Sequence, residues 1–210
     1  MKIVATVVDA REAALASELG PDLLEVRMDL MDADPGEEIA SIRSAWRGPV
    51  ILTNRSAAEG GMFRGDPGEW WNLVSPLLPL VDLVDVERPF SPACPEIRRQ
   101  GKRIIASLHT DTMPSPGDLS RMALELRRYG DIPKIVVRPG NRHDLLVLLK
   151  FTLDAGKPIC TGVLGDEHRY ARVILPLFGS EFAYTHMGTP AAPGQYSLGE
   201  FREILDLLRV

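Results

Sequence analysis

The strongest candidate for covalent chemistry is a lysine inside an apolar run. Lys134 lies in the segment Ile132–Val137, where most of the neighbours are aliphatic side chains. Burial among such side chains disfavours the ammonium form and lowers the pKa of a lysine. A neutral amine is a nucleophile that forms imines with ketones. The alternative interpretation is structural, with the lysine extending its ammonium group into solvent at an edge of the protein.

A histidine at the end of another apolar run could supply acid–base chemistry. His109 closes the stretch RIIASLHT, and imidazole titrates near neutral pH. A single histidine after an apolar strand is more often structural, although a position at a strand end favours a catalytic role. The remaining histidines show no HxH or HExxH spacing, so the sequence predicts no metal site. They are His143, His168 and His186.

A third run carries charges at alternate positions. Glu25, Arg27 and Asp29 are two residues apart, which predicts that all three share one face of a strand. Three charges in an otherwise apolar strand are costly unless they pair or bind a ligand. A solvated strand end or a structural ion-pair network remains the alternative.

Two further segments carry cations that could bind anions. Arg55 ends the run Leu52-Thr53-Asn54-Arg55 and is followed by Glu59 and two glycines, which let backbone approach a ligand. This pattern is typical of an anion-binding loop at a strand end. Arg172, within GDEHRYAR, precedes an apolar run and is predicted to point inward.

These residues fall within an alternation of strand-like and helix-like segments. Continuous apolar runs rich in Val and Ile are typical of parallel strands covered on both faces. Eight such runs occur, at residues 2–8, 22–28, 50–54, 83–87, 103–108, 132–137, 158–163 and 181–185. Alternation of strands with helices predicts a parallel sheet with right-handed crossovers.

Helix signals separate most of the runs. Residues Asp9–Glu12 and Ser197–Glu200 have the pattern of a capping box, and Pro116 suits the first turn of a helix. Two units are weaker, because prolines interrupt residues 71–80 and the helical segment in 91–100 is short.

The unit count favours an α/β fold with one (β/α)8 TIM barrel as a single catalytic domain over residues 1–210. At 210 residues the barrel is near the small end of the range for this fold. An open doubly wound sheet is the main alternative, but it would prefer a glycine fingerprint after the first strand, where VVDAREA has no GxGxxG. A barrel places its active site at the carboxyl ends of the strands, where the candidate residues lie.

Composition excludes several classes of protein. The chain has 24 Lys+Arg against 29 Asp+Glu, a net charge of −5 that argues against a general nucleic-acid binder. A hydrophobic content of 45% is too high for a disordered chain. No apolar stretch reaches the roughly 20 residues of a membrane span, and the N-terminal run is too short for a signal peptide. We therefore expect a cytoplasmic protein. The two cysteines, Cys94 and Cys160, form no CxxC pair, and Cys160 lies in an apolar run that predicts a buried inert thiol.

Taken in order, these motifs resemble the type I 3-dehydroquinate dehydratases, the Schiff-base class of the shikimate pathway. The landmarks are EVRMD from Glu25, TNRSAAEGG from Thr53, His109, DIPKIVV around Lys134, and FGSEFAYTHMGTPAAPGQ ending at Gln195. They span nearly the whole chain. The resemblance implies a (β/α)8 barrel, a small-molecule substrate, and neither a metal nor an organic cofactor. Members of the family are often dimers, so a homodimer is one expectation.

The resemblance also implies roles for individual residues. Lys134 would form an imine with the ketone of 3-dehydroquinate, His109 would be the general acid and base, and Glu59 would support that histidine. Substrate contacts are implied at Glu25, Arg27, Arg55, Arg172, Gln195 and, as a further contact, Thr6. Ala191 departs from the family, which often has serine there, and this removes a hydroxyl contact to the substrate.

In the implied reaction, His109 removes a proton beside the iminium carbon and then protonates the departing hydroxide, giving 3-dehydroshikimate. Arg172 and Gln195 would hold the substrate carboxylate, and segments 60–65 and 190–196 would close over the site. Two alternatives stay open. A class I aldolase would share the lysine but would need a phosphate-binding loop, for which GVLGDEHR and MGTPAAPGQ are unconvincing. The other is a non-catalytic barrel that binds a small carboxylate.

Overall fold

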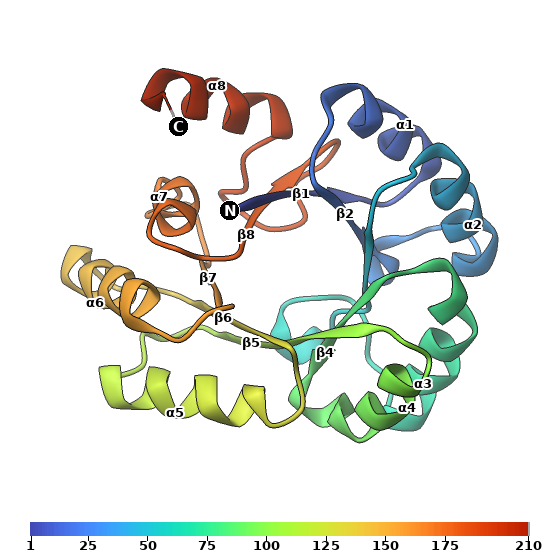
Figure 1. The fold of residues 1–210 in the computed structure, drawn as a ribbon, viewed down its shortest axis with the longest axis horizontal. Coiled ribbons are helices and arrows are strands. Elements are labelled where there is room, and N and C mark those ends of the chain that lie inside the picture. Colours follow the sequence, from blue (N-terminus) through green and yellow to red (C-terminus); the bar gives the residue numbers. More distant parts are fainter. Residues whose placement is uncertain (210) are drawn as a thin grey trace.

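The computed structural model describes residues 1–209, and in it strands and helices alternate around a ring (Figure 1). The strands are β1 Lys2–Val7, β2 Leu23–Arg27, β3 Val50–Thr53, β4 Leu83–Glu87, β5 Arg103–Thr110, β6 Ile132–Val137, β7 Cys160–Val163 and β8 Phe182–His186. The helices are α1 Ala10–Leu19, α2 Pro35–Ala45, α3 Pro67–Val74, α4 Cys94–Arg99, α5 Pro116–Arg127, α6 Arg142–Asp154, α7 Ala171–Leu177 and α8 Leu198–Leu208.

All paired strands are parallel, in the order β7-β6-β5-β4-β3-β2-β1-β8. Between β7 and β8, where the barrel closes, fewer hydrogen bonds form than in a full ladder of paired strands. The Glu181 N–H donates to the Ile159 carbonyl at 2.7 Å, and the buried Ser180 hydroxyl accepts from the Thr161 N–H at 3.0 Å. The side chain of Ser180 thereby supplies part of the missing ladder, and the predicted (β/α)8 barrel is confirmed.

Most helices form where the sequence predicts them, with two differences in detail. At α8 the capping box of Ser197 and Glu200 is reciprocal. At α1 only half of it forms, because the Glu12 carboxylate accepts from the Val8 N–H at 3.0 Å. The two prolines after α3 produce a 3-10 helix, Ser75–Leu80, since proline lacks the donor that an α-helix needs.

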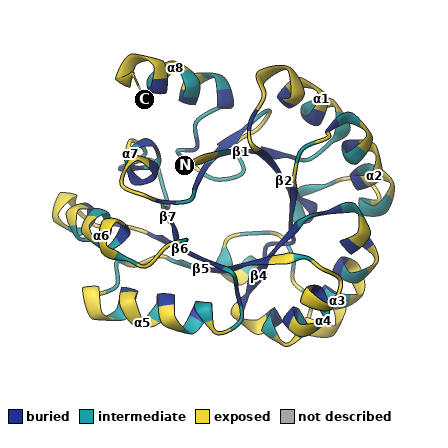
Figure 2. Cartoon of the chain, viewed as in Figure 1, coloured by how far each residue is buried: buried dark blue, intermediate teal, exposed yellow. Residues whose placement is uncertain are grey.

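The interior of the barrel begins with an apolar layer to which each strand contributes one side chain. Its members are Val4, Leu23, Ile51, Leu83, Ile105, Ile132, Cys160 and Phe182. The strands are buried on both faces, whereas the helices are exposed on their outer side (Figure 2). This layer closes the amino-terminal end of the barrel and leaves the carboxyl end for other side chains.

Both cysteines are buried, as expected for Cys160, and burial raises the pKa of each thiol to about 11. A thiol with that pKa is protonated at neutral pH and is a weak nucleophile. Over residues 1–209, no helix combines the length and the apolar character needed to cross a membrane.

Candidate active site

The next inward positions, two residues beyond the apolar layer on each strand, are almost all polar. They are Thr6, Glu25, Thr53, Asp85, Ser107, Lys134, Gly162 and Tyr184. Two residues further toward the carboxyl ends lie four more charged or titratable side chains, Arg27, Arg55, Glu87 and His109. Polar groups are therefore concentrated at the end of the barrel where this fold places its active sites.

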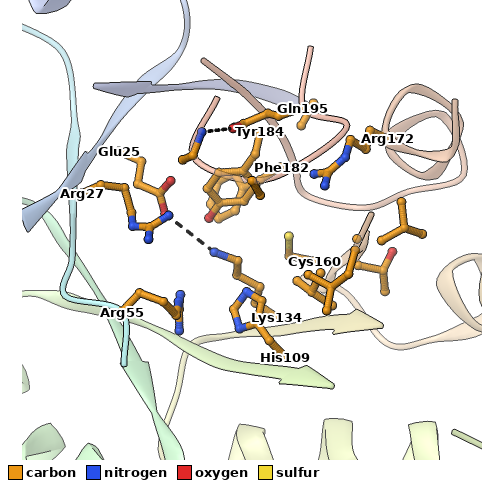
Figure 3. A pocket seen from close by; sticks show the side chains of 18 residues that line it. Glu25, Arg27, Arg55, His109, Lys134, Cys160, Arg172, Phe182, Tyr184 and Gln195 are labelled. Atoms are coloured by element: carbon orange, nitrogen blue, oxygen red, sulfur yellow. Dashed lines mark hydrogen bonds and ion pairs between the residues drawn. The ribbon is translucent and has the colours of Figure 1, made fainter. Parts of the chain in front are cut away.

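A pocket opens at this end, and most of the predicted site residues line it (Figure 3). These are Glu25, Arg27, Arg55, His109, Lys134, Arg172 and Gln195. The pocket adjoins a wider cavity of about 510 Å³, which Glu59 lines together with Arg138 and Asp166. Thr6 lies behind the lining, where its hydroxyl contacts Glu25.

Lys134 is buried, but its amine is not surrounded by apolar groups. Its Nζ lies 3.0 Å from Asp85 Oδ2 and 3.7 Å from Glu25 Oε1, with the ring centre of Tyr184 at 4.1 Å. The expected apolar environment was wrong, because strand alternation turns the adjacent Ile135 outward and the lysine inward, toward carboxylates on other strands. A solvent-exposed lysine is equally contradicted, since Lys134 is only 5% exposed.

The carboxylate of Glu25 is held from two strands. Its Oε2 accepts from the Thr6 hydroxyl at 2.8 Å, and its Oε1 accepts from the Thr53 hydroxyl at 2.9 Å. Glu25 is 5% exposed and keeps the remaining lone pairs of both oxygens for other donors. It therefore presents a fixed acceptor to the pocket, beside the lysine.

Arg55 is the centre of a buried ion-pair network. Its Nη1 donates to Glu87 Oε1 and to Ser107 Oγ, each at 2.9 Å, and its Nη2 donates to Asp85 Oδ1 at 2.8 Å. Burial alone would lower the pKa of Arg55, but Asp85 and Glu87 outweigh it and raise that pKa above its usual value. Burial likewise opposes ionisation of Asp85, yet Arg55 and Lys134 hold its pKa well below the usual range.

His109 is oriented by Glu59. The Glu59 Oε2 accepts from the His109 backbone N–H at 2.9 Å and lies within hydrogen-bond distance of Nδ1, at 2.8 Å, which leaves Nε2 as the nitrogen that can exchange a proton. Burial, together with the cations Arg55 and Lys134, lowers the pKa of His109 well below its usual value. Burial and the nearby Glu87 raise the pKa of Glu59 to about 8.

Asp29 lies outside the strand that carries Glu25 and Arg27, which corrects the predicted arrangement on one strand face. The strand β2 ends at Arg27, and Met28–Leu30 form a 3-10 turn. Asp29 pairs with Arg27 through two bonds, from Nε at 2.8 Å and from Nη2 at 2.7 Å. Its oxygens also accept the backbone N–H groups of Arg55 and Met62, so it fixes the loop after β3.

The opposite wall of the pocket carries Arg172 and Gln195. Among the described residues, no carboxylate lies within ion-pair distance of Arg172, whose Nη2 donates to the Pro193 carbonyl at 3.0 Å. Burial lowers the pKa of Arg172 to about 10, although Asp166 opposes this. The Ala191 N–H donates to Gln195 Oε1 at 3.0 Å and orients the amide. This wall offers an incompletely paired cation to an anionic ligand.

Sequence reasoning missed four residues of the site. Asp85, Glu87, Ser107 and Tyr184 were not singled out, although Asp85 and Glu87 alternate in LVDVE just as Glu25 and Arg27 do in LEVR. That spacing was a usable signal. Within residues 1–209 there is no group of three or more His, Cys, Asp or Glu side chains placed to hold a metal ion.

Comparison with known proteins agrees with this geometry. Residues 3–210 match the family described as type I 3-dehydroquinase. The 3-dehydroquinate dehydratase of Methanoregula boonei is 50% identical over 208 residues, covering 99% of this chain and 100% of that protein. The enzyme of that name from Methanospirillum hungatei is 37% identical, covering 99% of this chain and 81% of that protein.

Solved structures give the same result. The crystal structure of 3-dehydroquinate dehydratase from Geobacillus kaustophilus has a TM-score of 0.89 at 28% identity, covering 99% of this chain and 91% of that one. The type I enzyme from Clostridium difficile, with covalently modified comenic acid, has a TM-score of 0.85 at 26% identity and the same coverage. With the family match over residues 3–210, these likenesses show that the chain belongs to the type I 3-dehydroquinase family.

Proposed function

We propose that this protein dehydrates 3-dehydroquinate to 3-dehydroshikimate through an imine on Lys134, with His109 as general acid and base. The observation that carries the proposal is the pocket itself. It joins a buried lysine, a histidine held by Glu59, and, on the facing wall, an arginine that pairs with no carboxylate of residues 1–209. A ketone that also bears a carboxylate would use all three groups at once.

The reaction begins when the amine of Lys134 loses a proton and attacks the ketone carbon. His109, an unprotonated base by virtue of its lowered pKa, is in the same pocket to receive a proton. The adduct loses the ketone oxygen as water and becomes an iminium ion. Asp85, at 3.0 Å from Nζ, stabilises the positive nitrogen throughout.

Elimination then uses the histidine twice. The iminium draws electrons from the adjacent carbon, and His109 Nε2 takes a proton from that carbon to give an enamine. The enamine electrons re-form the iminium as the hydroxyl one carbon further leaves, and His109 protonates it so that it departs as water. Addition of water to the conjugated iminium releases 3-dehydroshikimate and restores the lysine amine. No external oxidant or reductant is needed.

Binding of the substrate is divided between the two walls. Arg172 and Gln195 hold the carboxylate, while Glu25, Arg27 and Arg55 hold ring hydroxyls and one another. Arg55 already donates three of its five N–H groups to protein acceptors. We therefore assign it two tasks, fixing Asp85 and Glu87 and offering its remaining N–H groups to the substrate.

Reductive trapping tests the proposed function. Borohydride added with 3-dehydroquinate should attach the mass of the reduced ligand to the peptide that contains Lys134, as measured by mass spectrometry. A class I aldolase would instead trap its own phosphorylated substrate. A non-catalytic carboxylate-binding barrel would gain no mass with any ketone, and that outcome would contradict the proposal.

Replacing Arg172 by glutamine is expected to raise KM for 3-dehydroquinate about 10- to 100-fold, because a charge-assisted bond to the carboxylate is lost. The value of kcat should fall less, since the reacting carbons of the substrate lie near Lys134 and His109, at the opposite wall of the pocket. Steady-state kinetics measure the effect, with the exposed Arg11→Gln on α1 as the matched control. An unchanged KM would remove Arg172 from the binding site.

The pH profile should depend on Glu59. Burial and Glu87 raise the pKa of Glu59 to about 8, so its carboxylate fraction, which stabilises a protonated His109, grows as pH rises through that value. We expect kcat to rise with pH on a limb near 8. Glu59→Gln should remove this limb and lower kcat by at least about tenfold. Glu87→Gln removes a neighbouring negative charge and should move the limb to lower pH. A limb that neither substitution changes would contradict the assignment.

We also propose that residues 1–210 act as one catalytic domain, that the enzyme works in the cytoplasm, and that two copies associate. The support for association is the outer side of α6, where Leu146 is 63% exposed and Leu153 is 59% exposed. Sedimentation equilibrium should give twice the chain mass of 23.2 kDa. A mass of one chain at all concentrations would refute the homodimer.

A further inference from the structure

Tyr184 lines the pocket, yet none of the roles described above uses it. It lies on β8, two residues beyond Phe182 of the apolar layer, so its side chain points into the barrel (Figure 3). Its ring centre is 4.1 Å from Lys134 Nζ, the reacting atom. Its hydroxyl is buried and makes no hydrogen bond with any other residue of the described chain.

A buried hydroxyl without a partner is unfavourable, because folding removes its water and returns nothing in exchange. Such a group in the core of a barrel would be expected to be replaced by phenylalanine at no loss of packing. In a binding pocket, by contrast, a ligand oxygen supplies the missing partner. The position of Tyr184 beside Lys134 therefore points to contact with the substrate.

The surroundings of the Tyr184 phenol decide whether it donates or accepts a hydrogen bond. Burial and the nearby carboxylate of Glu25 raise the pKa of Tyr184 well above its usual value. The phenol therefore keeps its proton and acts as a donor. Glu25, held by Thr6 and Thr53, acts only as an acceptor when ionised.

A donor and an acceptor facing the same space recognise a group that both donates and accepts. A hydroxyl has this property, whereas a ketone only accepts. Figure 3 shows the ring of Tyr184 between Glu25 and Arg172, with the amine of Lys134 facing the ring. A ring whose ketone carbon reaches Lys134 would thus place a neighbouring hydroxyl between Glu25 and Tyr184.

We propose that Tyr184 is a further catalytic residue, whose hydroxyl donates a hydrogen bond to a ring hydroxyl of the substrate and whose ring face attracts the positive nitrogen formed on Lys134. The inference rests on the proposed function, because it takes the substrate to be a hydroxylated cyclic ketone. The aromatic face supports the nitrogen electrostatically, as aromatic rings do for cations within about 6 Å.

Tyr184→Phe separates the two contributions, since it removes the hydroxyl and keeps the ring. We expect KM for 3-dehydroquinate to rise about tenfold, the scale of one hydrogen bond lost in a closed site, with a smaller change in kcat. The Lys134 adduct should still be trapped by borohydride at saturating substrate. Tyr170→Phe, at an exposed tyrosine that does not line the pocket, is the matched control.

Substrate analogues that each lack one ring hydroxyl identify the group that is bound. The penalty of Tyr184→Phe should disappear for the analogue that lacks the contacted hydroxyl and persist for the others. Tyr184→Leu removes the ring as well, and should lower the fraction of Lys134 trapped at saturating substrate below that of Tyr184→Phe. The phenylalanine variant should unfold at the wild-type temperature or above it, because the hydroxyl that it loses is buried and has no partner among the described residues.

Failure of this inference is distinguishable from failure of the proposed function. If the wild type traps and converts 3-dehydroquinate while Tyr184→Phe has the same KM and kcat, the role of Tyr184 is refuted and the function stands. An equal penalty with every analogue also refutes it, since that pattern indicates a general structural effect. A wild type that forms no adduct would refute the function itself.

Discussion

Lys134→Ala is expected to abolish covalent trapping and to lower kcat by about 10⁴-fold or more, because in the proposed mechanism the nucleophile and the electron sink are the same atom. Without the amine, the ketone remains a poor acceptor of electrons from the neighbouring C–H bond. No other lysine lines the pocket as the structure describes it, so no second amine can substitute. Mass spectrometry after borohydride and a spectroscopic assay of the conjugated product measure the two effects.

The controls must separate loss of chemistry from loss of the buried charge. Removing Lys134 leaves Glu25 and Asp85 without their ammonium partner, although Arg55 still binds Asp85 at 2.8 Å. Breaking a buried pair costs about 3–5 kcal/mol of stability, so thermal unfolding of the variant should be measured. Lys134→Arg keeps a cation beside Asp85 but supplies no nucleophile, and it should be equally inactive. Turnover at the wild-type rate in either variant would refute the imine mechanism.

His109→Ala is expected to leave imine formation intact while slowing elimination about 10²- to 10⁴-fold, the range of general acid–base catalysis. The variant should therefore accumulate an adduct with the mass of the unreacted substrate. In deuterated water, exchange of the proton next to the imine should become slow, because Nε2 no longer removes it. Single-turnover kinetics with borohydride quenching measure both steps.

The exposed His143 at the start of α6 provides a matched control, since His143→Ala makes the same substitution far from the pocket. An unchanged kcat in His109→Ala would disprove the acid–base assignment. So would loss of the adduct in a folded His109→Ala variant, because that result would place the histidine in imine formation and leave elimination to another group.

The sequence predicted the barrel well because its signals are local. Each Val- and Ile-rich run predicts one buried parallel strand, and capping residues such as Asp9 and Ser197 begin a helix at the residue where the structure begins it. The same local reasoning placed Lys134 and His109 on strands that end in the pocket. It also misplaced Asp29, because nothing in EVRMD indicates that the strand stops at Arg27.

The sequence could not show which way the side chains around Lys134 point, and the reason is physical. In β6 the residues on both sides of Lys134 are apolar, as is typical of a parallel strand covered on both faces, so the pattern does not tell which of them point into the barrel. The prediction of an apolar environment for Lys134 came from its neighbours in the chain. The environment it has comes from Asp85 and Glu25, which are 49 and 109 positions away along the chain.

By itself, the sequence determined the alternation of strands and helices and singled out Lys134 and His109 as candidates for the nucleophile and the base, since these depend on residue types and short spacings. Only the tertiary structure decided which charges meet. Closure of the barrel brings Thr6 within 3.4 Å of Gln195 across 189 positions, places Arg172 on one wall with its Nη2 on the Pro193 carbonyl, and brings the ring of Tyr184 against Lys134. The energy of such contacts depends on distance in space, which sequence separation does not encode.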